Sequence, residues 1–171
     1  ATFRTKNEGG NKEIEESAYK DMLIAISESG DIDMVDVEVY FMDEKNTKDI
    51  VKSLKKNVVV VGSYHDFDKT PSYDEIIKRL CFMKSQGVSI PKLACMPQNR
   101  HDVVTLMEAT QDFVSKNVGL PVITMSMGDY GKVSRVAGKS FGSAMTFGCL
   151  GKASAPGQIN VDDLRAILNI L

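Results

Sequence analysis

Short apolar runs alternate along this chain with longer segments in which apolar residues recur every three or four positions. The short runs predict six β-strands, and the longer segments predict five helices. Thr70 and Pro71 are expected to start the third helix, and Gly30 and Gly87 to follow the first and the third. The strands are expected at residues 2–5, 34–41, 58–62, 89–96, 121–127 and 143–148, and the helices at about 11–29, 44–56, 71–86, 99–116 and 161–171.

The regular alternation of strand and helix indicates parallel strands joined by helical crossovers. The fully apolar residues 58–61 fit a parallel strand that is covered on both faces. An open doubly wound sheet and an eight-stranded barrel both fit this order, but a complete barrel has about 250 residues. The chain has 171 residues. We therefore predict one α/β domain over residues 1–171, a (β/α)8 TIM barrel that lacks its first two βα units.

The composition excludes several classes of partner. The net charge of −2 provides no positive field for nucleic acid or an anionic membrane. No apolar run reaches the ~20 residues that span a bilayer. Three widely spaced cysteines form no CxxC pair and suit a reducing compartment, and two histidines are too few for the usual zinc sites. We predict a cytoplasmic protein without a metal, a nucleic-acid partner or a membrane partner.

Lys92 is the main candidate for chemistry, because it falls within the strand predicted at 89–96. A strand covered on both faces is a costly place for an ammonium group. Desolvation in general lowers the pKa of a lysine amine, and the free amine forms imines with carbonyl substrates. The alternative is a lysine that reaches water at the strand end or pairs with an acid such as Glu38.

A second group of polar residues follows the strands predicted at 58–62 and 2–5. His65 comes three residues after its strand, at the edge where α/β folds place catalytic groups, and it suits a general base. Glu8 could orient this histidine, and Arg4 could bind substrate oxygens. The plainer alternatives are a loop histidine bonded to backbone and a surface cluster of charges.

A third group lies in the last third of the chain. Arg135 suits bidentate binding of a carboxylate, and its alternative is a structural salt bridge. Ser154 and Gln158 flank a turn at residues 156–157 and could close over a ligand, although an ordinary turn has the same pattern. From the pattern alone, three further residues are interpreted as core residues of strands, namely Met125, Met127 and Phe147.

Several short motifs stand in order along the whole chain. In this combination they resemble the type I 3-dehydroquinate dehydratase family. The motifs are Phe3-Arg4, Glu8-Gly9-Gly10, Ser63-Tyr64-His65-Asp66-Phe67, Thr70-Pro71, Ile90-Pro91-Lys92, Met96-Pro97, Thr124-Met125-Ser126-Met127, Ser134-Arg135, Gly138, Phe141-Gly142-Ser143, Thr146-Phe147 and Ser154-Ala155-Pro156-Gly157-Gln158.

The resemblance implies a (β/α)8 barrel that converts 3-dehydroquinate to 3-dehydroshikimate in the shikimate pathway, without a cofactor. By similarity, Lys92 forms an imine with the substrate ketone. His65 removes the neighbouring proton and returns one to the departing hydroxyl, with Glu8 as its partner. Arg135, Ser154 and Gln158 are implied to hold the carboxylate side of the substrate. The other implied substrate contacts are Arg4, Met125, Met127, Phe147 and Ala155.

The chain departs from the family in one respect. Family members carry an upstream segment with two more strands, to which nothing in these 171 residues corresponds. We expect the whole enzyme to be active and this span alone to be inactive and poorly stable, because a barrel seam would be open. The alternatives are an inactive N-terminally truncated fragment and another imine-forming barrel lyase of the class I aldolase type. The resemblance also implies a homodimer.

Overall fold

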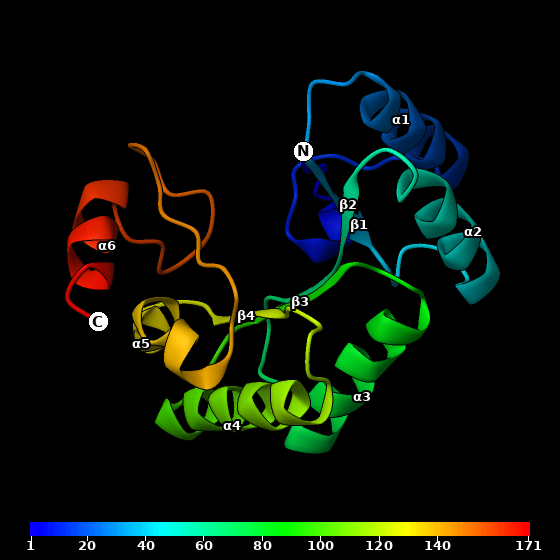
Figure 1. The fold of residues 1–171 in the computed structure, drawn as a ribbon. Coiled ribbons are helices and arrows are strands. Elements are labelled where there is room, and N and C mark those ends of the chain that lie inside the picture. The colour runs from blue at the N-terminus through cyan, green and yellow to red at the C-terminus, as the bar shows by residue number, and fades with distance from the viewer. The chain divides into compact units, whose positions relative to one another are not determined.

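The computed structural model describes residues 1–171 and has an α/β fold (Figure 1). The chain divides into two compact units, residues 1–65 with 79–92 and residues 66–78 with 93–171. The strands are β1 Met34–Glu38, β2 Val59–Asp66, β3 Ile90–Cys95 and β4 Ile123–Ser126. The helices are η1 Lys6–Glu8, α1 Glu16–Glu28, α2 Glu44–Leu54, α3 Tyr73–Ser85, α4 Arg100–Lys116, α5 Lys132–Val136, η2 Gly138–Phe141 and α6 Val161–Leu168.

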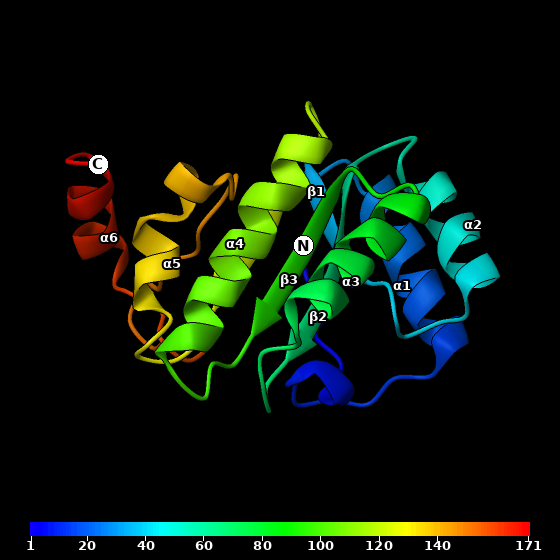
Figure 2. The ribbon, with the colours of Figure 1, turned by 90° about the horizontal axis from the view of Figure 1, so that it is seen from below.

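The first unit contains β1, β2 and the beginning of β3, adjacent in this order. β1 and β2 are parallel, with Asp36 opposite Val61 and Glu38 opposite Ser63. Helices α1 and α2 lie side by side in both views (Figures 1 and 2). The apolar faces of these elements form the core of the unit, which includes Tyr19, Leu23, Val35, Val37, Ile50, Leu54 and Val60.

The second unit contains the end of β3 beside β4, with α4 and α5 packed against β4. Helix α4 begins where its sequence pattern indicates, because the side chain of Asn99 accepts a hydrogen bond from the backbone N–H of Asp102 at 3.1 Å. The hydroxyls of Thr110 and Thr124 are 2.7 Å apart and join α4 to β4 inside the core. Other core residues of this unit are Leu93, Cys95, Leu106, Phe113 and Ile123.

The α/β class and the parallel arrangement are confirmed, but two of the six predicted strands are absent. At residues 2–5 only isolated bridges form, because the backbone turns back on itself and the N–H of Gly10 bonds to the carbonyl of Thr5 at 2.8 Å. At 143–148 a single isolated bridge joins Val122 to Ser143, and the hydroxyl of Ser143 accepts from the N–H of Thr124 at 3.0 Å. The prediction of strands there is wrong.

The ends of several other elements also differ from the prediction. Strand β2 continues to Asp66, so that His65 lies on the strand rather than in a loop after it. Helix α3 begins at Tyr73, and Ser72 rather than Thr70 accepts from a first-turn N–H. Helix α5 and η2 were not predicted, because five and four residues are too few for a helical period to be recognised.

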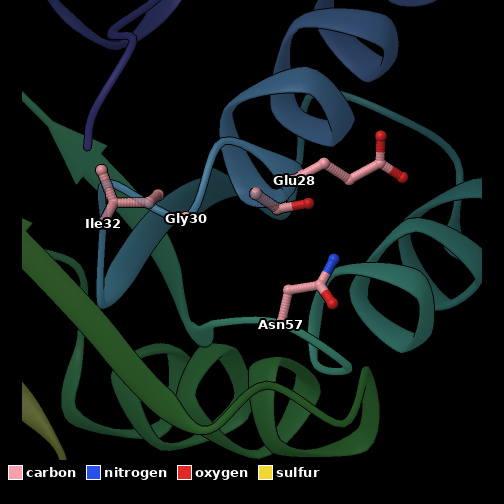
Figure 3. A pocket seen from close by; sticks show the side chains of 5 residues that line it. Glu28, Gly30, Ile32 and Asn57 are labelled. Atoms are coloured by element: carbon pink, nitrogen blue, oxygen red, sulfur yellow. The ribbon is translucent and has the colours of Figure 1, made fainter.

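A pocket of about 480 Å³ lies in the first unit where α1 ends and β1 and β2 begin (Figure 3). Its lining includes Glu28, Gly30, Ile32 and Asn57. Ligands and catalytic groups of parallel α/β sheets gather at the opposite, carboxyl ends of the strands, and this pocket brings no group of complementary catalytic side chains together. None of the helices has the length and apolar character needed to cross a membrane.

Candidate active site

Strand β1 places two carboxylates on one face of the first unit. Asp36 and Glu38 are two residues apart, so both side chains leave the strand on the same side. They are 4% and 1% exposed. Buried carboxylates are unfavourable unless other groups donate hydrogen bonds to them. The residues around them therefore have to supply donors and positive charge.

Lys92 supplies one of these charges. Its Nζ lies 2.8 Å from Oδ2 of Asp36, and the residue is 8% exposed. The other oxygen of Asp36, Oδ1, accepts from the hydroxyl of Ser63 at 2.6 Å and from Nη2 of Arg4 at 2.9 Å. Burial opposes ionisation of Asp36, but the positive charges of Lys92 and Arg4 outweigh it and lower the pKa of this carboxyl. Lys92 thus pairs with an acid, as in the alternative considered for it, and that acid is Asp36 rather than Glu38, which was given as an example.

Arg4 supplies the second positive charge. Besides Asp36, its guanidinium contacts Glu38 at 2.8 Å and Glu8 at 3.3 Å, and it donates to the hydroxyl of Ser63 at 3.0 Å. Burial works against the charged guanidinium, but the carboxylates outweigh it and raise the pKa of Arg4. The alternative of a surface charge cluster is wrong, because the side chains of Arg4 and Glu8 are only 17% and 8% exposed.

Glu38 fixes the N-terminal segment to β1. Its two oxygens accept from the backbone N–H and the hydroxyl of Thr5, at 2.8 and 2.6 Å. The N–H of Glu38 in turn donates to the hydroxyl of Tyr19 at 3.1 Å, which connects α1 to the same strand. These bonds hold Arg4, the residue before Thr5, over the face of the strands.

His65 and Glu8 form the other end of the cluster. Nδ1 of His65 lies 2.8 Å from Oε2 of Glu8. Burial, together with the charges of Arg4 and Lys92, lowers the pKa of His65 to about 3. Burial, together with the negative charge of Glu38, raises the pKa of Glu8 to about 9. At neutral pH the imidazole is therefore uncharged.

Arg135 in the second unit is buried without an opposite charge. It is 1% exposed, its Nη2 donates to the carbonyl of Pro156 at 3.1 Å, and its Nη1 lies 3.7 Å from the sulfur of Met125. Its Nε is buried and has no hydrogen-bond partner. Burial lowers the pKa of this guanidinium. The alternative of a structural salt bridge is wrong, because Arg135 makes no ion pair.

The loop at residues 154–158 is held by hydrogen bonds within it and by a close approach to Gly128. Oε1 of Gln158 accepts from the N–H of Ser154 at 2.7 Å and from its hydroxyl at 3.1 Å. Gly157 has φ of 75°, and a Cβ there would lie 2.3 Å from the carbonyl oxygen of Gly128. Only glycine allows so close an approach. The turn is therefore held against the end of β4, with Ser154 exposed.

The apolar residues expected around a ligand fall into two groups. Met125 and Met127 are buried, at or just after the end of β4. Phe147 lies outside any strand and is 38% exposed, so its interpretation as a core strand residue is wrong. That interpretation depended on the strand predicted at 143–148, which does not form. Ala155 is half-buried in the loop beside Pro156.

The structure thus brings four of the predicted residues into one cluster of the first unit, namely Arg4, Glu8, His65 and Lys92. The other predicted residues belong to the second unit, namely Arg135, Ser154, Gln158, Met125, Met127, Phe147 and Ala155. The sequence reasoning missed Asp36 and Ser63. Two acids that alternate with valines suggest an ordinary half-exposed strand. Asp36 would have been recognised as a buried charge only if this strand had been taken as covered on both faces.

Comparison with known proteins places this arrangement in context. Residues 1–171 match the family model described as Type I 3-dehydroquinase. The 3-dehydroquinate dehydratase of Salmonella typhimurium is 46% identical over 170 residues, and the aligned region covers 99% of this chain and 68% of that protein. The corresponding protein of Syntrophotalea carbinolica is 47% identical over 171 residues, with 99% and 67% covered.

The solved structures agree with the sequence relatives. A type I 3-dehydroquinate dehydratase of Clostridium difficile, with covalently modified comenic acid, has a TM-score of 0.93 at 45% identity, with 99% of this chain and 66% of that one covered. A 3-dehydroquinate dehydratase of Geobacillus kaustophilus also has a TM-score of 0.93, at 37% identity. The chain spans about two thirds of the length of these relatives.

Proposed function

Because the chain belongs to the type I 3-dehydroquinase family, we propose that its natural full-length protein eliminates water from 3-dehydroquinate to give 3-dehydroshikimate. The enzyme would then be a carbon–oxygen lyase that works through a Schiff base. The observation that carries this proposal is the family match across residues 1–171, which includes a buried lysine in contact with a carboxylate and near a neutral imidazole.

The proposed reaction begins with Lys92. Its amine attacks the ketone carbon, the ketone oxygen leaves as water, and the resulting imine takes up one proton, which is released again when the iminium is hydrolysed at the end of the cycle. The imine withdraws electrons from the adjacent carbon, so that its C–H bond breaks, the proton goes to His65, and the electron pair forms a neutral enamine. The pair then returns, expels the hydroxyl group with a proton from His65, and restores the iminium. Water finally hydrolyses the iminium and releases the product and the free amine.

The surroundings of His65 bear on its role as the proposed base. Burial lowers its pKa to about 3, which keeps the imidazole uncharged at neutral pH and also makes it a weaker base than a free imidazole. Glu8 contacts Nδ1 at 2.8 Å and fixes the plane of the ring. Arg4 is fully occupied by carboxylates and Ser63, so its contact with the substrate would add to an existing network.

The second unit supports a role in binding the substrate carboxylate. Arg135 is a buried guanidinium without a counter-ion, and its Nε lacks a hydrogen-bond partner. An unpaired buried charge is unfavourable, so a carboxylate ligand would stabilise it. Ser154 and Gln158 would add hydrogen bonds from the loop. Met125, Met127, Phe147 and Ala155 are proposed as apolar contacts of the ring.

Reduction of the Schiff base tests the proposal directly. The natural full-length protein is incubated with 3-dehydroquinate and sodium borohydride, digested, and analysed by mass spectrometry. The adduct is expected on the peptide that contains Lys92, and Lys92→Met should abolish both the adduct and the elimination of water. The exposed Lys52→Met is the matched control and should keep both. Turnover by Lys92→Met at the wild-type rate would refute the imine mechanism.

The same family membership supports three further proposals for the full-length protein. Its fold is proposed to be a (β/α)8 barrel, its assembly a homodimer, and its location the cytoplasm. Sedimentation equilibrium tests the assembly, with twice the monomer mass expected. An aldol-cleaving lyase of the class I type is the rival, and it would release two carbonyl products in place of water and an unsaturated ketone.

A further inference from the structure

We propose that Asp36 is a further catalytic residue of this enzyme, which holds the nitrogen of Lys92 before the reaction and accepts the hydrogen bond of the protonated imine during it. The inference rests on the proposed function, because it assigns a partner to the imine nitrogen. Asp36 touches that nitrogen directly, since its Oδ2 lies 2.8 Å from Nζ of Lys92.

The two oxygens of Asp36 have different surroundings. Oδ1 accepts from the hydroxyl of Ser63 at 2.6 Å and from Nη2 of Arg4 at 2.9 Å. These bonds fix the rotation of the carboxylate and direct Oδ2 to Lys92. The Ser63 hydroxyl is itself completely buried and lies on β2, so it belongs to the rigid sheet. A carboxylate anchored in this way needs little reorganisation when charge develops beside it.

The chemistry requires such a group at the imine nitrogen. The imine withdraws electrons effectively only while its nitrogen is protonated, and a carboxylate at hydrogen-bond distance favours that charged form. Asp36 is 4% exposed, so water screens the interaction little. The iminium cation replaces the ammonium cation of Lys92 during the reaction. The carboxylate of Asp36 can form an ion pair with each of them in turn.

The other charged groups of the first unit are less suited to this role. Glu38 is engaged by Thr5 through both oxygens and by Arg4 through Oε1. Glu8 is bonded to His65 and Arg4. Asp36 is therefore the acid in this unit that presents an oxygen to the reacting nitrogen.

Three variants test the inference in the natural full-length protein. Asp36→Asn keeps the shape and removes the negative charge, and Ser63→Ala keeps Asp36 and removes one of its anchors. The exposed Asp33→Asn, which lies just before β1, is the matched control. The measurements are kcat and KM for 3-dehydroquinate, and the pH dependence of adduct formation with cyanoborohydride, which reduces the protonated imine.

For Asp36→Asn we expect kcat to fall about 100-fold or more, as when a preorganised partner of transition-state charge is removed. The midpoint pH of trapping should fall by about one unit or more, because an adjacent opposite charge shifts a titration by that amount. Ser63→Ala should change both quantities in the same direction and less, about 10-fold in kcat, as expected for a positioning residue. Asp33→Asn should match the wild type.

The outcomes separate the inference from the function on which it rests. A wild-type protein without an adduct at Lys92 would overturn both. An adduct at Lys92 in the wild type, with kcat and trapping midpoint unchanged in Asp36→Asn, would overturn the inference alone. If Asp36→Asn does not give the wild-type circular dichroism spectrum, Ser63→Ala decides, and wild-type values for that variant would also overturn the inference.

Discussion

Glu8 and His65 should give the protein a stability optimum in mildly acidic solution. The pKa of Glu8 is raised from 4.5 to about 9 by burial and the charge of Glu38, so between these pH values the folded state holds a proton that the unfolded state has lost. Each pH unit in this window should therefore lower the free energy of unfolding by about 1.4 kcal/mol. This stabilisation is complete below pH 4.5 and is lost as the pH rises towards 9.

His65 acts in the opposite direction. Its pKa is lowered from 6.5 to about 3, so between these values the unfolded state binds a proton that the folded state does not. The free energy of unfolding should then rise with pH by about 1.4 kcal/mol per unit. The two effects cancel between pH 4.5 and 6.5. From pH 6.5 to 8.5 only Glu8 contributes, and the expected loss is about 2.7 kcal/mol.

The assay is urea unfolding followed by circular dichroism at half-unit steps from pH 4 to 9. Glu8→Gln should remove the decline above pH 6.5, because glutamine does not titrate. The exposed Glu28→Gln, at the end of α1, is the control and should keep the decline. If wild type and Glu8→Gln lose stability in parallel between pH 6.5 and 8.5, the raised pKa of Glu8 is refuted.

Three further predictions concern packing, a buried hydrogen bond and thiol reactivity. Gly62→Ala should lower the free energy of unfolding by about 1–3 kcal/mol, because its Cβ would lie 2.5 Å from Cγ1 of Val88, and Val88→Ala in the same chain should recover part of this loss in urea titrations. Tyr19→Phe should cost about 1–3 kcal/mol, since its hydroxyl accepts from a buried backbone N–H of β1. Burial raises the pKa of Cys95 to about 12, so iodoacetamide at pH 8 should alkylate the exposed Cys81 in the folded protein and Cys95 only after unfolding.

The elements that bury apolar stripes were predictable from the sequence, and the edges of the sheet were not. Helix α4 and strand β3 were recognised almost to their ends, because each carries a strong apolar pattern. Residues 143–148 have the composition of a strand. The structure forms only one isolated bridge there, between Val122 and Ser143, and the hydroxyl of Ser143 accepts from the N–H of Thr124, a contact that no local pattern reveals.

The candidate site shows the same division. Lys92 could be singled out because a charge inside an apolar strand is anomalous. His65, Glu8 and Arg4 were candidates because they follow predicted strands, and the family resemblance supplied their roles. Asp36 was missed because its anomaly depends on knowing which face of β1 is buried. Its contacts come from three partners 27 to 56 residues away in the chain, and only the folded structure brings them together.

A count of charges explains which acid of the cluster holds a proton. Arg4 and Lys92 provide two positive charges, whereas Asp36, Glu38 and Glu8 would provide three negative ones. A buried surplus of one negative charge is unfavourable, and it is relieved at the acid with the weakest contact to a cation. Glu8 is that acid, at 3.3 Å from Arg4 against 2.8 to 2.9 Å for the others, and its pKa is the one raised to about 9. The proton therefore resides beside His65, while Asp36 stays ionised next to Nζ of Lys92.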